Sequence, residues 1–202
     1  MDDTLEGGQQ LIESDLQKKF GISRSPLREA FRNLEKNELV DIIPRKGTFV
    51  KKITRKNIAE NIPVRAVLEG LAAKKAYQRI NEQELKHMEE TLRNMKKAVE
   101  KEDTRTYWKN HLIFHKIFIN ASRNDTLINI LNILRMHSNR YKYSHQFYME
   151  DFAQNMIEHE QIYNLFRDRE RDNSSRVAKL VQRHIDDSLE PFLKFIENNN
   201  NL

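Results

Sequence analysis

Hydrophobic residues recur every three or four positions along most of the chain, which is the period of an amphipathic helix. From about residue 55 to 197 such segments follow one another with short polar connections, and they predict an all-helical region of about six helices. The clearest stripe carries charged residues on its other sides and consists of Leu85, Met88, Leu92, Met95 and Val99. This pattern is typical of a helix that packs against a core by one face.

The ends of several of these helices carry recognisable signals. Asn81 and Glu84 have the spacing of a capping box, Asp103 precedes a segment that is apolar nearly all round, and Asn124 precedes the next helix. Before them, Pro63 is expected to start or kink a helix. The stripe predicted to face the core in that helix is Val64, Val67, Leu68, Leu71 and Ala72. Later helices are expected at 127–143, with Ile130 inward, and at 152–166 and 177–196.

The first fifty residues have a different pattern. A short helix at 13–20, with Leu16 and Phe20 inward, ends at Gly21, and a second helix follows with Ser25 as the expected N-cap. Two short apolar runs at 40–43 and 48–50 then flank the basic turn 44–47, which predicts a β-hairpin. A helix, a glycine turn, a second helix and a hairpin together indicate a winged helix-turn-helix, the architecture in which the second helix enters a DNA major groove.

Charge supports this interpretation only through its placement, because the net charge of +5 is modest. Basic residues gather between positions 18 and 36, whereas the flanking segments are acidic. The alternative is an ordinary solvated helix of mixed charge. The turn, the helix and the hairpin together favour DNA binding over that alternative.

The N-terminal segment also resembles a known family. The segments Leu11-x-Glu13-x-x-Leu16, Gly21 to Ala30 and Arg45-x-Gly47-x-Phe49-Val50 are similar to the winged helix-turn-helix of the GntR transcriptional regulators. The resemblance implies that Arg24 and Arg28 contact operator DNA and that Gly47 lets the wing approach it. The full set of DNA-binding candidates is Arg24, Ser25, Arg28, Arg32, Lys46 and Gly47. Because family members carry a further helix before this segment, residues 1–53 are expected to form a DNA-binding domain that lacks its first helix.

Four histidines lie on inward faces of the predicted helices. His111 and His115 are four residues apart on the most apolar helix, and His159 and His184 each lie on the apolar stripe of a later helix. A helical bundle can build a metal site from facing helices, and neutral imidazoles suit zinc, nickel, copper and iron. For any one of them a core histidine that is satisfied by a neighbour is the competing interpretation. Four of them together favour a metal.

Residues 54–202 resemble the effector and dimerisation domain of the FadR subgroup, called the FCD domain. The similar segments are Arg65-x-x-Leu68-Glu69, Phe114-His115, Glu158-His159-x-x-Ile162 and His184-Ile185. The resemblance implies that the metal is held by three histidines and by an aspartate or asparagine four residues before the first of them. His111 stands at that position here, and Asn110 points about 100° away on the helix. Four imidazoles favour zinc, and nickel next.

The resemblance further implies a mostly α homodimer that binds a palindromic operator in double-stranded DNA and responds to a small organic acid. Arg65, Arg135 and Arg140 are candidates to bind the effector carboxylate, and each is equally well explained as a structural or surface arginine. The expected function is therefore a ligand-responsive transcriptional regulator, with repression as the commoner mode in the family. The chain has no cysteine and no apolar run that could span a membrane, and a cytoplasmic location is expected.

Two other functions remain open at this point. A metal-dependent hydrolase would use the histidine cluster, but Leu112 stands where the zinc helix H-E-x-x-H places its general base, so we predict that the chain is not an enzyme. A DNA-binding protein without an effector would leave the four inward histidines unexplained.

Overall fold

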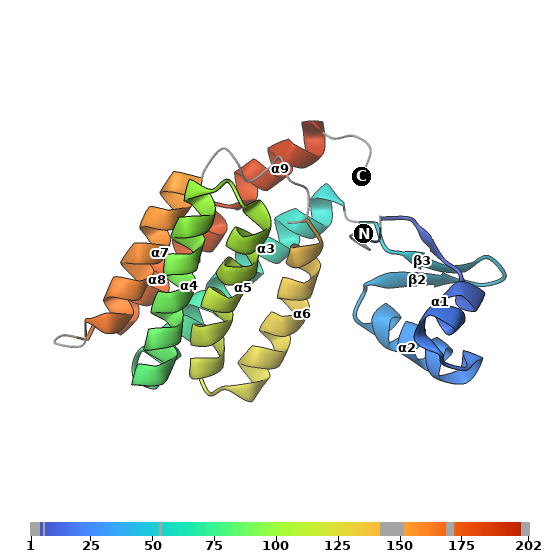
Figure 1. The fold of residues 1–202 in the computed structure, drawn as a ribbon, viewed down its shortest axis with the longest axis horizontal. Coiled ribbons are helices and arrows are strands. Elements are labelled where there is room, and N and C mark those ends of the chain that lie inside the picture. Colours follow the sequence, from blue (N-terminus) through green and yellow to red (C-terminus); the bar gives the residue numbers. More distant parts are fainter. Residues whose placement is uncertain (1–4, 6, 53, 142–151, 169–171, 199–202) are drawn as a thin grey trace. The chain divides into compact units, whose positions relative to one another are not determined.

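The computed structural model describes residues 5, 7–52, 54–141, 152–168 and 172–198. The chain divides into two compact units, one that ends at Thr54 and one that spans Arg55–Asn198 (Figure 1). The fold is mostly α with a small sheet in the first unit, as the sequence predicts.

The N-terminal unit is a winged helix-turn-helix. Its elements, in order, are β1 (Gln10–Leu11), α1 (Glu13–Phe20), α2 (Arg24–Lys36), β2 (Val40–Ile43) and β3 (Gly47–Val50). The strands form an antiparallel sheet in the order β1-β3-β2. Alternate strand residues and one face of α2 bury a small common core that consists of Leu11, Leu27, Phe31, Val40 and Val50. This core fixes α2 against the hairpin and leaves the opposite face of α2 exposed.

Two details of this unit differ from the predictions. The second helix begins at Arg24 with Ser23 at the N-cap position, so Ser25 lies in its first turn and is not the cap. Pro26 is tolerated there because the first backbone N–H groups of a helix have no partner within it. Phe20 is not inward: it is 62% exposed. None of the eight residues of α1 is fully buried. The apolar period of so short a helix therefore did not show which of its side chains contact the rest of the unit.

The second unit is a bundle of long helices. Its elements within the described ranges are α3 (Arg55–Tyr77), α4 (Glu82–Glu100), α5 (Thr104–Ala121), α6 (Asp125–Tyr141), α7 (Phe152–Arg167), α8 (Ser174–Asp186) and α9 (Leu189–Asn198). Helix α3 is central, since it contacts α5, α6, α8 and α9, while α4 packs on α5 and α7 (Figure 1). Among the described residues, no helix has the length and apolarity that crossing a membrane would require.

Helix α3 departs most from its predicted pattern. It runs unbroken through Pro63, because residues on both sides of the proline, including Ile62 and Ala66, are buried in the same core. That burial offsets the backbone hydrogen bond lost at a helical proline. Three members of the predicted inward stripe are wrong, since Val64, Val67 and Leu71 are 51%, 55% and 41% exposed, whereas Ala72 is buried as predicted. The inward face of α3 includes, besides Ile58, Ile62 and Tyr77, several small residues and a charged pair, Arg65 and Glu69, that sequence periodicity does not reveal.

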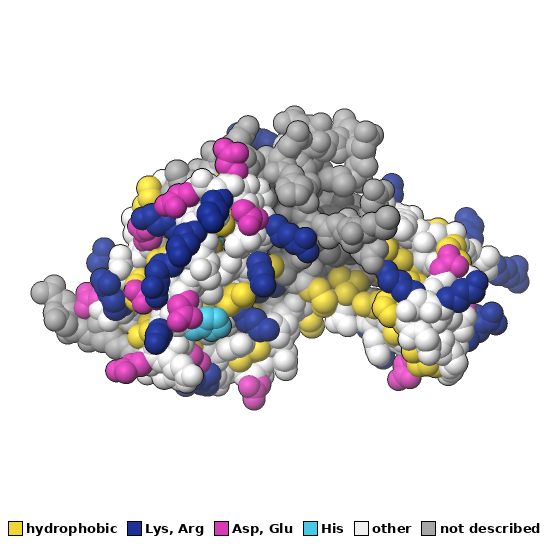
Figure 2. Space-filling model, in the orientation of Figure 1, with side chains coloured by type: hydrophobic (Ala, Val, Ile, Leu, Met, Phe, Trp, Pro, Cys, Tyr) yellow, Lys and Arg dark blue, Asp and Glu magenta, His cyan; other side chains and the backbone are white. Residues whose placement is uncertain are grey.

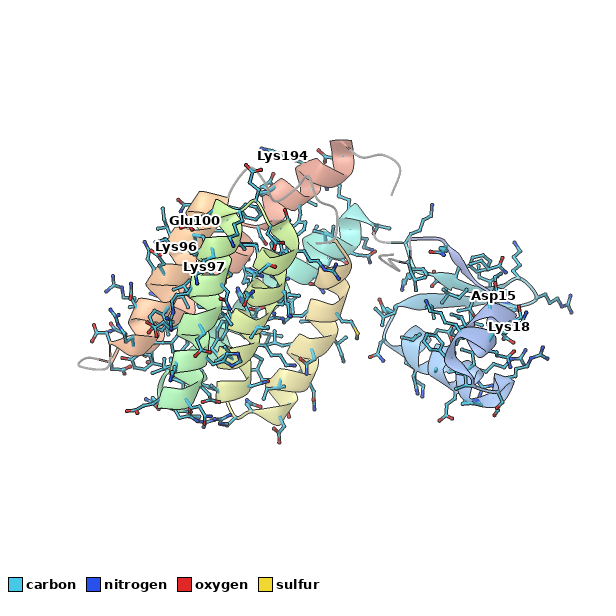
Figure 3. The ribbon with its side chains drawn as sticks, in the orientation of Figure 1. Asp15, Lys18, Lys96, Lys97, Glu100 and Lys194 are labelled. Atoms are coloured by element: carbon cyan, nitrogen blue, oxygen red, sulfur yellow. The ribbon has the colours of Figure 1, made fainter. Side chains whose placement is uncertain are left out.

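Helix α4 agrees with its prediction. The side chains and backbones of Asn81 and Glu84 form both hydrogen bonds of a capping box, and Met88 and Met95 are fully buried. Its solvent face carries a row of basic side chains with acidic ones beside them, as Figure 2 shows. Lys96 and Lys97 are labelled on this helix in Figure 3.

Two predictions for the later helices need correction. Ile130 on α6 is 43% exposed rather than inward. The helix expected over 177–196 is two helices, α8 and α9, separated at Asp187 and Ser188. The hydroxyl of Ser188 donates to the carbonyl of Ile185 at 2.6 Å, so a serine side chain caps the end of α8 where the apolar pattern continues unbroken.

Gly70 sets the distance between α3 and α8. A Cβ atom at this position would lie 2.8 Å from the carbonyl oxygen of Ala178 and 3.3 Å from Cβ of Gln182. An alanine normally stabilises a helix relative to glycine by roughly 0.5–1 kcal/mol. We expect Gly70→Ala to lower the free energy of unfolding of the helical unit instead, by about 1–3 kcal/mol, because the helices must separate. Chemical denaturation, followed by circular dichroism, measures this free energy. Lys74→Ala, at an exposed position of the same helix, is the control and should change the free energy of unfolding little.

Candidate functional site

The exposed face of α2 is basic. Its residues line a shallow groove composed of Arg24, Ser25, Arg28, Glu29, Arg32, Asn33 and Lys36. All of the DNA-binding candidates predicted on this helix therefore share one surface. Two of them are held by α1, since the carboxylate of Glu13 lies 3.4 Å from Nε of Arg24 and accepts a 3.0 Å hydrogen bond from Nε of Arg28.

The other two DNA-binding candidates, Lys46 and Gly47, are exposed in the wing. The turn requires positive φ at Arg45 (63°) and at Gly47 (116°). Nε2 of Gln10 donates a 2.9 Å hydrogen bond to the carbonyl of Lys46, so β1 ties down the tip of the hairpin. A Cβ atom at Gly47 would lie 2.8 Å from the same Nε2. Glycine is thus needed here for the backbone conformation and for the approach of Gln10.

The four predicted histidines meet inside the helical unit. His111 and His115 come from α5, His159 from α7 and His184 from α8, and all four are buried. Each offers one ring nitrogen, and these nitrogens all lie within 4.8 Å of one another. Nε2 of His115 and Nε2 of His159 are 3.3 Å apart.

Oxygen atoms around the cluster determine which nitrogen faces inward. Nδ1 of His115 lies 2.8 Å from Glu69, Nδ1 of His184 lies 2.6 Å from Glu158, and Nδ1 of His159 lies 2.6 Å from the carbonyl of Asn155. An oxygen acceptor at Nδ1 favours the tautomer with its proton there, which leaves Nε2 with a bare lone pair. Two such lone pairs 3.3 Å apart repel one another unless a cation lies between them.

The donor set fits a divalent metal. Tetrahedral zinc with nitrogen ligands at ~2.0–2.1 Å places those ligands about 3.3–3.4 Å apart, which agrees with the closest pair of ring nitrogens. Burial lowers the pKa of His115 to about 3 and outweighs the attraction of Glu69, so the ring is neutral, as a ligand must be. Asn110 is turned elsewhere: it donates to the carbonyl of Thr106 and accepts from Asn94.

Glu69 contacts the histidine cluster through His115 and is only 1% exposed. Burial acts to raise its pKa, but the charges of Arg135 and Arg65 and the hydrogen bond from His115 hold that pKa well below the ordinary value. Nε of Arg65 lies 3.1 Å and Nη1 of Arg135 3.7 Å from its carboxylate, and Arg135 also donates to the carbonyl of Leu112. Two of the three effector candidates are therefore already engaged with a carboxylate of the chain itself. The side chain of the third, Arg140, lies outside the described side chains.

Sequence reasoning missed Glu69 and Glu158 as partners of the histidines. Glu158 does point away from its neighbour His159, as helix geometry requires, but it reaches His184 on α8. The hydrogen bond from His184 holds the pKa of Glu158 below its usual range, against the effect of partial burial. Both residues stand in the segments that resemble the FCD domain, but nothing in their spacing along the chain reveals these two histidine partners.

Comparison with known proteins agrees with both halves of this description. Residues 60–187 match the FCD domain, and residues 1–50 match the family described as bacterial regulatory proteins, gntR family. The chain belongs to the GntR family and carries an FCD domain. The matched members are named as transcriptional regulators.

Individual GntR relatives support the assignment. The chain is 36% identical over 130 residues to an uncharacterized HTH-type transcriptional regulator, YdhC, of Bacillus subtilis, which covers 63% of this chain and 58% of that protein. It is 24% identical over 190 residues to the gluconate operon transcriptional repressor of Bacillus licheniformis, with coverage of 91% and 76%. The chain spans about half the length of several of the curated relatives that it matches.

Solved structures show the same fold. E. coli McbR/YncC aligns with a TM-score of 0.74 at 19% identity, over 98% of this chain and 91% of that one. A GntR regulator from Rhodococcus sp. RHA1 aligns with a TM-score of 0.74 at 20% identity, over 96% and 91%.

The wing provides a test of local geometry in this GntR chain. We expect Gly47→Ala to destabilise the winged-helix unit by about 1–3 kcal/mol, because φ of 116° disfavours any side chain and because Gln10 must move. Gly21→Ala is the matched control: its φ is 65° and its Cβ would meet nothing within 4 Å. Hydrogen exchange or urea denaturation should therefore show a smaller loss for Gly21→Ala than for Gly47→Ala. Equal losses would contradict the role of Gln10.

Proposed function

We propose that this chain is a metal-dependent, effector-responsive transcriptional repressor that binds a palindromic DNA operator as a homodimer. Residues 1–53 are assigned to DNA binding, and residues 54–202 to effector binding and dimerisation. The observation that carries the proposal is the meeting of one ring nitrogen from each of four buried imidazoles, in a chain whose α2 presents an arginine-rich surface.

The DNA-binding part rests on the exposed face of α2. Arg24, Arg28 and Arg32 project from one side of a helix whose other side is fixed by the core of the winged helix. A guanidinium can donate two parallel hydrogen bonds to O6 and N7 of guanine, whereas Lys46 at the wing suits a phosphate. The repressor role follows relatives named as repressors, among them the gluconate operon repressors.

The metal part rests on chemistry of the donor set. His111, His115, His159 and His184 would hold a divalent ion that supplies a Lewis-acidic centre for a carboxylate ligand. Four imidazole donors, with no carboxylate bound to the ion, favour zinc, then nickel, over manganese or magnesium. The chain's own residues provide the orientation: Glu69 and Glu158 fix the tautomer and the ring planes of His115 and His184.

A small organic acid is the effector class that the surroundings favour. Arg65 and Arg135 bring two positive charges to Glu69, close behind the histidines. An incoming carboxylate can share these arginines with Glu69 or displace that contact. Since Glu69 lies on α3 and the histidines lie on α5, α7 and α8, such a rearrangement changes the packing of four helices at once.

The dimer is supported by the outward face of α3 and its neighbour α6. Large aliphatic side chains stay exposed on these two packed helices, namely Val64, Val67, Leu71, Ile130 and Ile133. Burying them against a second copy removes apolar surface from water, at about 25 cal/mol per Å². Two copies also match the two half-sites of a palindrome.

Metal binding is tested first. We expect purified protein to retain about one zinc ion per chain after dialysis, and EDTA to lower its melting temperature, because an ion that binds only the folded state stabilises it. His159→Ala should lose the metal and should melt at the same temperature with and without EDTA. The exposed His87→Ala should behave like the unaltered chain. Retention of metal by His159→Ala, or an unaltered chain that binds no divalent ion, would contradict the site.

DNA binding is tested with a duplex selected by the unaltered protein from a random pool. We expect a palindrome to be enriched and its affinity to fall roughly tenfold or more in Arg28→Ala, since one bidentate arginine–guanine contact is worth about 1–3 kcal/mol. Lys86→Ala, which removes one positive charge from α4, should bind normally. Anisotropy titrations with a panel of small organic acids should show release from DNA only for metal-loaded protein. Failure to enrich any palindrome would overturn the proposed function.

A further inference from the structure

One acidic side chain lies within the surface that is proposed to read DNA. Glu13 is the first residue of α1, and its two carboxylate oxygens are divided between two arginines of α2. Oε1 accepts from Nε of Arg28 at 3.0 Å, and Oε2 lies 3.4 Å from Nε of Arg24. The arginine side chains remain 58% and 68% exposed, so they stay accessible to DNA.

The atoms used in these contacts are informative. Both arginines face the carboxylate with Nε, and among the described residues their terminal nitrogens Nη1 and Nη2 make no hydrogen bond. That terminal pair is the fork that matches O6 and N7 of guanine. Glu13 therefore occupies the edge of each guanidinium that base recognition does not need.

The carboxylate of Glu13 also offsets repulsion between the two arginines. Arg24 and Arg28 are four residues apart on one helix face, where like charges repel one another. The first turn of α2 also contains no acidic residue to balance the helix dipole. A single negative charge between the two guanidinium groups lets both side chains lie on the same face in one arrangement.

We propose that Glu13 is a positioning residue for sequence recognition, which holds Arg24 and Arg28 so that both read bases rather than phosphates. The inference rests on the proposed DNA-binding function of α2. Without Glu13, each arginine regains its rotamer freedom, and a free guanidinium binds any nearby phosphate equally well. Loss of the carboxylate thus lowers affinity for the selected duplex and raises affinity for duplexes of unrelated sequence.

The opposite role for Glu13 is a competitor that occupies the arginines until DNA displaces it. Removal of a competitor strengthens binding to all sequences by one common factor and leaves the ratio of affinities unchanged. A third role is direct contact between Glu13 and a cytosine amino group. The three roles give different patterns of affinity and of base preference.

The experiment uses the full chain with Glu13→Gln, which keeps the shape and removes the charge. Two duplexes of equal length serve as probes: the palindrome selected by the unaltered protein, and its scrambled sequence. We expect the ratio of their affinities to fall about tenfold, the factor that corresponds to ~1.4 kcal/mol. Asp15→Asn removes the same charge from the same helix, where Asp15 is labelled in Figure 3, and it should preserve the ratio.

Base preference supplies the second measurement. Selection repeated with Glu13→Gln should relax the same positions that Arg24→Ala and Arg28→Ala relax separately. An unchanged affinity ratio, or a relaxed position that neither arginine variant affects, would overturn the inference. If the unaltered protein selects no palindrome, the proposed function itself fails. If it selects one and Glu13→Gln keeps the full ratio, only the role of Glu13 fails.

Discussion

The ionised carboxylate of Glu69, buried in the centre of the helical unit, is the interaction on which the rest of that unit depends. A buried charge is costly unless opposite charges and hydrogen-bond donors surround it. Here those groups come from three helices: Arg65 beside it on α3, His115 on α5 and Arg135 on α6. The carboxylate therefore fixes how these helices face one another and, through His115, how one imidazole enters the histidine cluster.

The histidine cluster continues this chain of contacts. Glu158 on α7 orients His184 on α8 in the same way that Glu69 orients His115, and a backbone carbonyl orients His159. For His115, His159 and His184, an oxygen on the outer side of the ring thus determines which nitrogen faces inward. Under the proposed function, a change of ligand at the cluster therefore acts directly on α3, α5, α7 and α8, without a distant relay.

The winged helix also contains carboxylate–arginine ion pairs, but these are exposed to solvent. Glu13 also lies between two arginines, but all three side chains reach solvent, where an ion pair contributes about 0–1 kcal/mol. Such a pair adds little to the free energy of unfolding, and DNA can readily replace the carboxylate as the partner of the arginines. Under the proposed role, the ion pairs of Glu13 serve to orient the two arginine side chains. The buried carboxylate at Glu69 thus contributes to the architecture, whereas the exposed one at Glu13 is suited to recognition.

The sequence by itself determined the features that depend on neighbours along the chain. Period and caps predicted α4 and its capping box, and the order of helices, glycine and hairpin predicted the winged helix. The four histidines were also found from their spacing on inward stripes. Only the tertiary structure decided which large apolar residues are buried: Phe20, Val64 and Ile130 satisfy the helical period and are nevertheless exposed. Periodicity shows that a helix has an apolar face, but it does not show whether that face meets this chain or something else. The contact between His115 and Glu69, 46 residues apart, likewise exists only because packing brings α3 and α5 together.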